Sequence, residues 1–236
     1  MKTCLLFDLD DTLYDYSKAH EEALKSAEKR FLQSEKKLSP QAFQLLFAQS
    51  RQEIISEYAG TSAAHSRSLF FERMLWKLKR KIHLPFIYEM TTMYWTTFFD
   101  HMKAFEGAEK LLKRLKEHGT KIGVVTNLSV DIQMKKLHTL GFHNYIDVLV
   151  TSEHAGREKP HPATIYEALS RLSAIKEDSI LVGDSLEEDI EAANAVGIDS
   201  VLFRTAWVEE REFDAKKPSY VVGSFADLEK LLDTVL

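Results

Sequence analysis

The sequence predicts an α/β fold: a Rossmann-like parallel sheet core covered by helices, with an all-helical cap inserted after the first strand. Three observations predict it. A short apolar segment at residues 3–7 ends abruptly in acidic residues. Residues 16–101 carry apolar side chains at helical spacing and contain a single glycine, Gly60. From residue 102 onward, short apolar segments alternate with amphipathic ones, which is typical of a parallel sheet with helices on both faces.

The elements before residue 102 are expected in this order. The first strand lies at residues 3–7, where Thr-Cys-Leu-Leu-Phe is apolar and the following Asp-Leu-Asp-Asp-Thr is not. Helices follow, and Pro40 and Pro85 mark points at which helices break or start. The predicted domains are an α/β core of residues 1–15 and 102–236 and a helical insertion of residues 16–101.

Strands and helices alternate through the rest of the core. Gly119 and Gly141 end the first two helices, and Pro162 and Asp184 precede later ones. We expect strands at residues 121–125, 147–150, 179–182, 200–203 and 220–222. We expect helices at residues 108–118 and 131–140, after Pro162, after Asp184 and from Phe225.

Composition excludes several classes of function. The formal net charge is -5, whereas a surface that holds polymeric nucleic acid is normally basic. The single cysteine, Cys4, excludes an intramolecular disulfide. Apolar runs are too short for a signal peptide or a membrane span. We therefore expect a cytoplasmic protein without nucleic-acid or membrane partners.

Four polar clusters stand where the sequence predicts sheet edges. Ligands of open α/β sheets bind beyond the carboxyl ends of the strands, so these clusters are candidates for one site. Each has an ordinary explanation alone, since aspartate, serine and threonine cap helices and turns and most lysines are solvated. Their coincidence at successive strand ends favours a functional site. The clusters are Asp8-Leu9-Asp10-Asp11-Thr12, Thr126-Asn127, Lys159-Pro160, and Gly183-Asp184-Ser185 with Asp189.

In this order the clusters resemble the four motifs of the haloacid-dehalogenase-like hydrolase superfamily, most of whose members are phosphatases. The helical insertion resembles the helical type of cap in that superfamily. The resemblance spans the whole chain, with the greatest likeness to bacterial pyrimidine 5'-nucleotidases and N-acylneuraminate-9-phosphatases. It implies a small phosphorylated substrate, with nucleoside 5'-monophosphates expected and sugar phosphates as the alternative.

The resemblance also implies roles for individual residues. Asp8 is expected to be the nucleophile that forms a phospho-aspartate, and Asp10 the general acid and base. Mg²⁺ is the expected cofactor, with Asp8, Asp184 and the backbone carbonyl of Asp10 as ligands and Asp189 supporting them from outside the ligand set. Thr126, the backbone at Asn127 and Lys159 are expected to bind the phosphate.

Other functions are less consistent with these residues. True haloacid dehalogenases typically lack counterparts of Asp10 and Asp184, and both are present here. A phosphomutase would keep all four motifs, so the sequence only disfavours it. Signalling receiver domains place the phosphorylated aspartate after the third strand, where this chain has Thr151-Ser152-Glu153, and they have no helical insertion. An inactive binding module would be expected to lack a motif residue. The physiological substrate and the oligomeric state stay open.

Overall fold

The computed structural model describes residues 2–204 and 217–236, and the chain divides into two compact units. The first unit comprises Met1–Asp15 and Lys103–Leu236, and we call it the α/β unit. The second comprises Tyr16–Met102, and we call it the helical unit. Each is described by itself.

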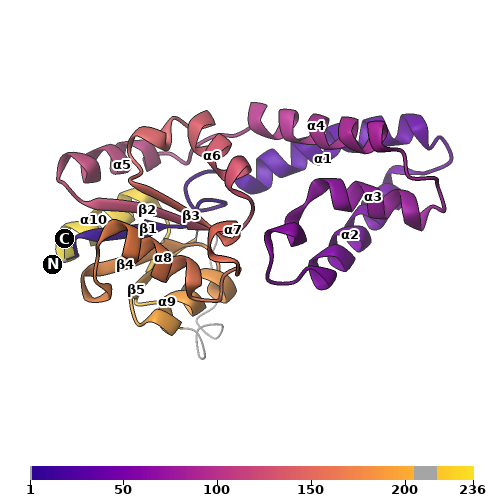
Figure 1. Cartoon of the computed structure of the whole chain (residues 1–236). Coiled ribbons are helices and arrows are strands. Elements are labelled where there is room, and N and C mark those ends of the chain that lie inside the picture. Colours follow the sequence, from indigo (N-terminus) through magenta and orange to yellow (C-terminus); the bar gives the residue numbers. More distant parts are fainter. Residues whose placement is uncertain (1, 205–216) are drawn as a thin grey trace. The chain divides into compact units, whose positions relative to one another are not determined.

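The α/β unit is built on one parallel sheet (Figure 1). The strands follow the order β3-β2-β1-β4-β5-β6, and every neighbouring pair is parallel. This confirms the predicted fold class. The strands are β1 (Cys4–Phe7), β2 (Lys121–Thr126), β3 (Val148–Thr151), β4 (Ser179–Gly183), β5 (Asp199–Phe203) and β6 (Tyr220–Val222).

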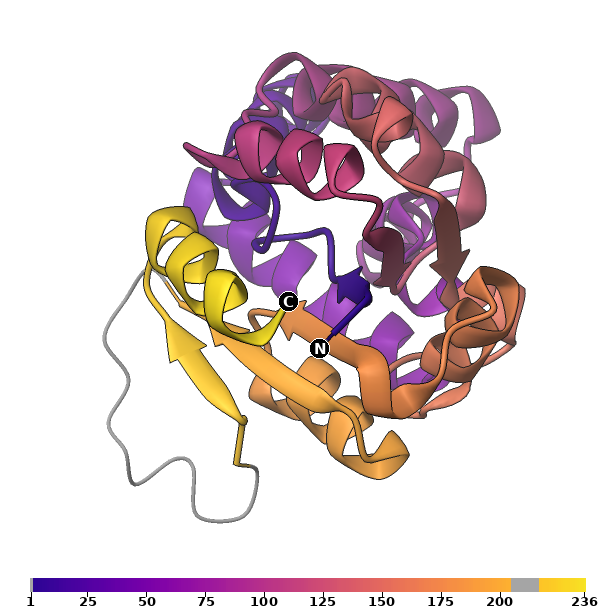
Figure 2. The same cartoon turned by 90° about the vertical axis from the view of Figure 1, so that its left-hand side faces the viewer.

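Helices cover both faces of the sheet. Helices α5 (Ala108–Glu117), α6 (Val130–Thr139) and α10 (Phe225–Val235) lie on one face. Helices α8 (Ala163–Leu172) and α9 (Glu191–Val196) lie on the other, with the short α7 (Ser152–Ala155) after β3. The two chain ends lie close together at one end of the sheet (Figure 2). Consistent with this, the amide of Lys2 donates to the carbonyl of Val235 at 2.8 Å.

The central strands are buried because helices pack on both of their faces. Leu6, Val125 and Leu181 have no exposed surface and contribute to one apolar cluster with residues of α8 and α9. Full burial of such a side chain stabilises a fold by roughly 1.5–3 kcal/mol. Gly123 allows close packing in β2, because a β-carbon there would stand 2.7 Å from Leu6 Cδ2. This packing fixes the positions of the strand ends.

The helical unit contains α1 (Tyr16–Ser34), α2 (Pro40–Glu57), α3 (Arg67–Lys77) and α4 (Leu84–Asp100), with a 3₁₀ turn at Ser62–His65. Pro40 occupies the first position of α2, where it has no backbone hydrogen bond to lose, and the side chain of Ser39 accepts from Ala42 N at 3.2 Å. Aromatic side chains form much of the unit's interior, including Phe31, Phe43, Phe47, Phe70 and Phe98.

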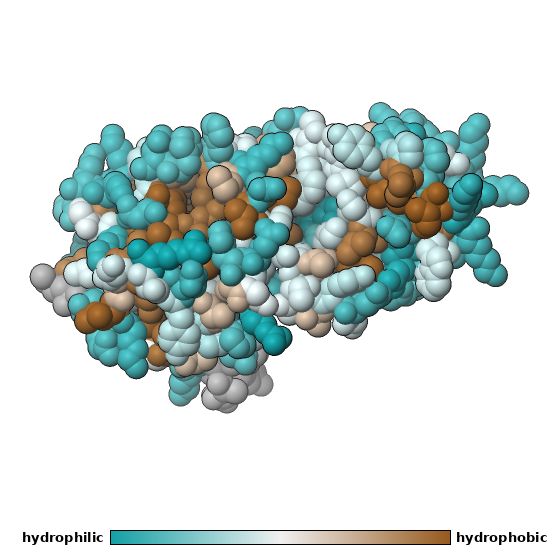
Figure 3. Space-filling view, viewed as in Figure 1, coloured by the Kyte–Doolittle hydropathy of each residue, from teal (hydrophilic) through white to brown (hydrophobic). Residues whose placement is uncertain are grey.

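The surface carries scattered hydrophobic groups (Figure 3). The large apolar side chains exposed on the helical unit are Leu45, Trp76, Ile82, Leu84 and Tyr88. Across residues 2–204 and 217–236, no helix combines the length and the apolar character needed to cross a membrane.

Candidate active site

The site forms where β1 ends between its two neighbours. β1 pairs with β2 on one side and with β4 on the other, so three carboxyl ends meet there. The amide of Asp8 donates to Val182 O at 2.8 Å, which extends the ladder one residue beyond the strand. After β1 the chain adds β2 and β3 on one side of the sheet and then β4, β5 and β6 on the other, and such switch points are where open α/β sheets bind ligands.

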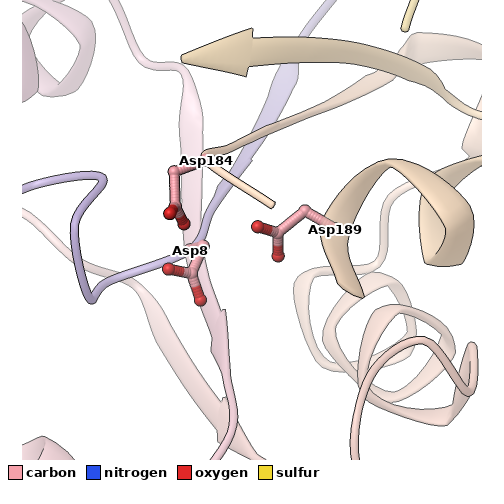
Figure 4. A group of neighbouring side chains, drawn as sticks. All are labelled: Asp8, Asp184 and Asp189. Carbon is pink, nitrogen blue, oxygen red and sulfur yellow. The ribbon is translucent and has the colours of Figure 1, made fainter. Parts of the chain in front are cut away.

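Three aspartates converge at this edge of the sheet. Asp8 follows β1, and Asp184 and Asp189 follow β4 (Figure 4). One carboxylate oxygen from each lies within 4.8 Å of the others. Asp8 and Asp189 are buried, and Asp184 is partly exposed. Three carboxylates this close repel one another and need positive charge between them.

Lys159 supplies one positive charge. Its Nζ donates to Asp8 Oδ1 at 2.6 Å, to Asp189 Oδ1 at 2.5 Å and to the carbonyl of Val125 at 2.9 Å. Burial alone would lower the pKa of Lys159, but the negative charges of Asp189 and Asp8 outweigh it and raise the pKa. Lys159 is therefore held as an ammonium inside the protein.

One lysine does not neutralise three carboxylates. Burial raises the pKa of Asp8 well above its ordinary value. The charge of Lys159 lowers this pKa, and the charges of Asp189 and Asp184 oppose that lowering. Burial, then the charges of Asp189 and Asp11, raise the pKa of Asp184 to about 7. Three ionised carboxylates and one ammonium leave two negative charges, and the donors are oxygens. The cluster thus fits a divalent cation that prefers oxygen ligands.

Asp189 is held by its surroundings. Its Oδ2 accepts from the amide of Ser185 at 3.0 Å, while Oδ1 accepts from Lys159. The turn η4 (Leu186–Ile190) is a π-helix in which Ile190 N donates to Ser185 O at 3.1 Å. The turn brings the Asp189 side chain back over the end of β4. Both oxygens have partners, so Asp189 fits a supporting place beside the ligands Asp8 and Asp184.

The second cluster is linked to the third. Asn127 Oδ1 accepts from the amide of Lys159 at 2.9 Å, and Asn127 Nδ2 donates to Glu188 Oε2 at 2.8 Å. The Asn127 side chain thereby joins the loops that follow β2, β3 and β4. Thr126 is buried and is the last residue of β2. The strand therefore ends one residue later than the predicted end at Val125.

Asp10 lies outside the acidic cluster and has partners of its own. Tyr14 Oη donates to Asp10 Oδ1 at 2.7 Å, and Lys136 Nζ donates to both Asp10 oxygens at 2.7 Å. Asp11, which follows Asp10 in the sequence, has a φ of 56°. This is a left-handed conformation that aspartate tolerates better than most residues. This turn returns the chain so that Tyr14 bridges to Asp10.

Two polar side chains at the site were not predicted from the sequence. Lys136 contacts Asp10, and Gln133 Nε2 donates to Thr126 Oγ1 and to Asn127 O, each at 2.7 Å. Both lie on α6 and are fully buried. They share a helix face with Leu137 and Leu140, at the spacing of a buried stripe. This helical spacing was the one signal in the sequence, and it does not show which residues the two side chains contact.

A family model described as haloacid dehalogenase-like hydrolase matches residues 5–203. The match covers most of the chain and includes all four polar clusters. The chain belongs to this family.

Curated relatives agree with the family. The haloacid dehalogenase-like chain is 34% identical over 203 residues to ribulose-1,5-bisphosphate 5-phosphatase of Halopiger xanaduensis, covering 86% of this chain and 85% of the relative. It is 32% identical over 214 residues to glyceraldehyde 3-phosphate phosphatase of Methanopyrus kandleri, covering 90% and 88%. The family and the relatives together show that the chain is a phosphatase.

Solved structures share the fold. A phosphatase of this family from Thermococcus onnurineus superposes with a TM-score of 0.74 and 22% sequence identity, covering 98% of each chain. At this identity the likeness concerns architecture alone.

Proposed function

We propose that this phosphatase hydrolyses small phosphorylated sugars by transferring the phosphoryl group to Asp8, with Mg²⁺ as its cofactor. The observation that carries the proposal is the position of Asp8. Its carboxylate is buried at the end of the central strand, 2.6 Å from the Lys159 ammonium and beside Asp184. This carboxylate lies beside one fixed cation and beside a site that fits a metal ion. Such a carboxylate is suited to attack an anionic phosphate.

The reaction has two steps. In the first, an Asp8 oxygen attacks phosphorus, the bond from phosphorus to the leaving oxygen breaks, and Asp10 gives that oxygen a proton. In the second, water attacks the phosphorus of the aspartyl phosphate and gives a proton to Asp10. The bond between Asp8 and phosphorus breaks, which releases inorganic phosphate and restores both carboxyl groups.

Charge is the main obstacle to the first step. At about 4 Å and an effective dielectric near 20, a carboxylate and a phosphate dianion repel by roughly 8 kcal/mol. A bound Mg²⁺ would offset this repulsion by neutralising charge on the carboxylates and the substrate phosphate. Asp8 and Asp184 would hold it, with the backbone carbonyl of Asp10, and Asp189 would support them.

The chain also offers groups to bind the phosphate. Lys159 presents fixed positive charge next to Asp8, and Thr126 brings a hydroxyl to the neighbouring strand end. The Asn127 side chain is used to join three loops, so its backbone amide is the group that we assign to a phosphate oxygen. These donors counteract charge on the transferring group.

The substrate class rests on the relatives. Two that match most of the chain are named for ribulose 1,5-bisphosphate and glyceraldehyde 3-phosphate, both phosphorylated sugars. Their names favour the sugar-phosphate alternative over the nucleoside 5'-monophosphates expected from the sequence resemblance.

The experiment compares kcat/KM for ribulose 1,5-bisphosphate, glyceraldehyde 3-phosphate, p-nitrophenyl phosphate and UMP in the presence of Mg²⁺. We expect at least one sugar phosphate to exceed UMP by tenfold or more, which is about 1.4 kcal/mol of transition-state binding. A higher value for UMP than for both sugar phosphates would overturn the substrate class. If none of the four compounds is hydrolysed, the proposed reaction is overturned as well.

A further inference from the structure

Lys136 is a cation that α6 carries into the interior of the α/β unit. Its side chain has no exposed surface, whereas the side chain of its partner Asp10 is 29% exposed. Both Asp10 oxygens accept from Lys136 Nζ at 2.7 Å, and Oδ1 also accepts from Tyr14 Oη at 2.7 Å. The Asp10 carboxylate thus accepts hydrogen bonds from the interior of the protein, while part of its surface is exposed.

These contacts leave Asp10 little freedom to rotate. A carboxylate that accepts from one ammonium through both oxygens is held in a plane, and the Tyr14 hydroxyl selects one edge of that plane. The Tyr14 main chain forms a β-bridge with Ala104, and the Tyr14 side chain is fully buried. The Lys136 ammonium also lies 5.9 Å from the centre of the Tyr14 ring. The side chains of Asp10, Tyr14 and Lys136 thus form one hydrogen-bonded cluster.

Stability alone is a poor explanation for this arrangement. Taking a lysine fully out of water is costly, and apolar replacements of buried ion pairs are often neutral or stabilising. α6 nevertheless uses two positions of its buried stripe for polar side chains, Lys136 towards Asp10 and Gln133 towards Thr126. Both targets are candidate site residues: Asp10 lies on the loop after β1, and Thr126 is the last residue of β2. The buried face of α6 therefore contacts candidate site residues at two strand ends.

We propose that Lys136, together with Tyr14, is a positioning residue that holds the Asp10 carboxyl group in the orientation required for both of its proton transfers. This inference rests on the proposed function, in which Asp10 protonates the leaving oxygen and later accepts a proton from water. Lys136 acts through Asp10 and does not touch the substrate. Its loss should therefore lower kcat and leave KM nearly unchanged.

The test is a double-mutant cycle of Lys136→Met and Asp10→Asn with p-nitrophenyl phosphate and Mg²⁺. Methionine has similar length and no charge, and misplacement of a catalytic group by about 1 Å can cost about a hundredfold in rate. We expect Lys136→Met to lower kcat roughly tenfold to a hundredfold. In the Asp10→Asn background the same change should have less than about a twofold effect, because the group that it positions is already gone.

Two further variants keep the result interpretable. Lys136→Arg retains the charge and should recover at least part of the lost kcat, and Tyr14→Phe removes only one hydroxyl and should give a smaller loss. Lys135→Met on the exposed face of α6 is the matched control and should keep wild-type kcat. Circular dichroism of each variant shows whether it is folded. If Lys136→Met fails to fold, the comparison of Lys136→Arg and Tyr14→Phe in the two Asp10 backgrounds decides the question.

Equal losses from Lys136→Met in the wild-type and Asp10→Asn backgrounds would overturn the positioning role, as would wild-type kcat in a folded Lys136→Met. In the fallback comparison, losses that persist undiminished in the Asp10→Asn background would overturn it too. Asp8→Asn separates this inference from the proposed function. If Asp8→Asn retains activity, the reaction scheme itself fails. If Asp8→Asn is inactive and the Lys136 and Asp10 changes are additive, only the positioning role fails.

Discussion

The carboxyl group of Asp189 packs directly against the backbone of Gly183, so a β-carbon at residue 183 would stand 2.3 Å from Asp189 Cγ. No real β-carbon approaches another carbon so closely. Gly183 ends β4, and Asp189 must reach back over it to meet Lys159 and the amide of Ser185. The glycine therefore has a role in placing the acid.

Gly183→Ala tests this relationship. The added methyl group must displace the Asp189 carboxylate, which is locked by hydrogen bonds, so we expect a loss of roughly 1–3 kcal/mol of stability. We also expect a large fall in kcat, because Lys159 and Asp8 would lose their alignment. Gly223→Ala is the control, since its β-carbon would meet the nearest atom, Arg204 O, at an ordinary 3.6 Å. Urea unfolding and steady-state kinetics of both variants check the prediction, and equal behaviour of the two would contradict it.

Lys159→Met removes the only cation that contacts both Asp8 and Asp189 in the described part of the chain. Breaking a buried pair leaves uncompensated charge, at a cost of about 3–5 kcal/mol. The deficit should shrink as the pH falls from 8 to 5, because burial raises the pKa of Asp8 above its ordinary value and that of Asp184 to about 7, and these carboxyl groups then take up protons. Lys230→Met is the control, since Lys230 pairs with Asp227 on the exposed surface. A deficit that did not change with pH would show that lost packing, not lost charge, destabilises the variant.

Metal binding should depend on the protonation of Asp184. Burial raises the pKa of Asp184 from 3.8 to about 7, so the folded, metal-free protein keeps a proton there that the unfolded chain releases above pH 4. That proton stabilises the fold at low pH, and its contribution is lost as the pH rises from about 4 to about 7. A metal must displace the proton, so apparent Mg²⁺ affinity should fall below pH 7.

Thermal unfolding with and without Mg²⁺ measures this linkage between pH 5 and pH 8. The rise in Tm caused by Mg²⁺ should be small at pH 5 and grow towards pH 8, and chelator should abolish it. Asp184→Asn should remove most of the rise at every pH. A rise in Tm that is the same at pH 5 and pH 8 would be evidence against Asp184 as a ligand.

The fold could be predicted because its signals are local. Buried strands appear as short apolar runs, helix ends carry Gly119 and Gly141, and a parallel sheet brings the carboxyl ends of its strands to one edge. The polar clusters at Asp8 and Asp184 could be brought together by that reasoning alone. The boundary at Thr126 was missed by one residue, because a threonine at a strand end has no apolar signal.

The contacts of α6 could not be predicted in the same way. A lysine in an amphipathic helix is normally solvated, and Lys135 and Lys136 are neighbours that differ only in the face to which they point. The buried face is decided by how α6 packs on the sheet, which is a tertiary property. Gln133 is subject to the same limit. The distance from each side chain to Asp10 or Thr126 depends on loops that close only in the folded chain.

Asp8 is proposed to carry the phosphoryl group during turnover. Acid quenching of the Asp10→Asn variant with p-nitrophenyl phosphate and Mg²⁺ should trap this state. p-Nitrophenolate is a good leaving group that needs little protonation, so loss of the general acid slows the first step less than loss of the general base slows the second. Mass spectrometry should then find one phosphoryl group on the peptide that contains Asp8, and none in the double variant with Asp8→Asn. Turnover without any phosphorylated peptide, or a phosphoryl group on another residue, would contradict the claim.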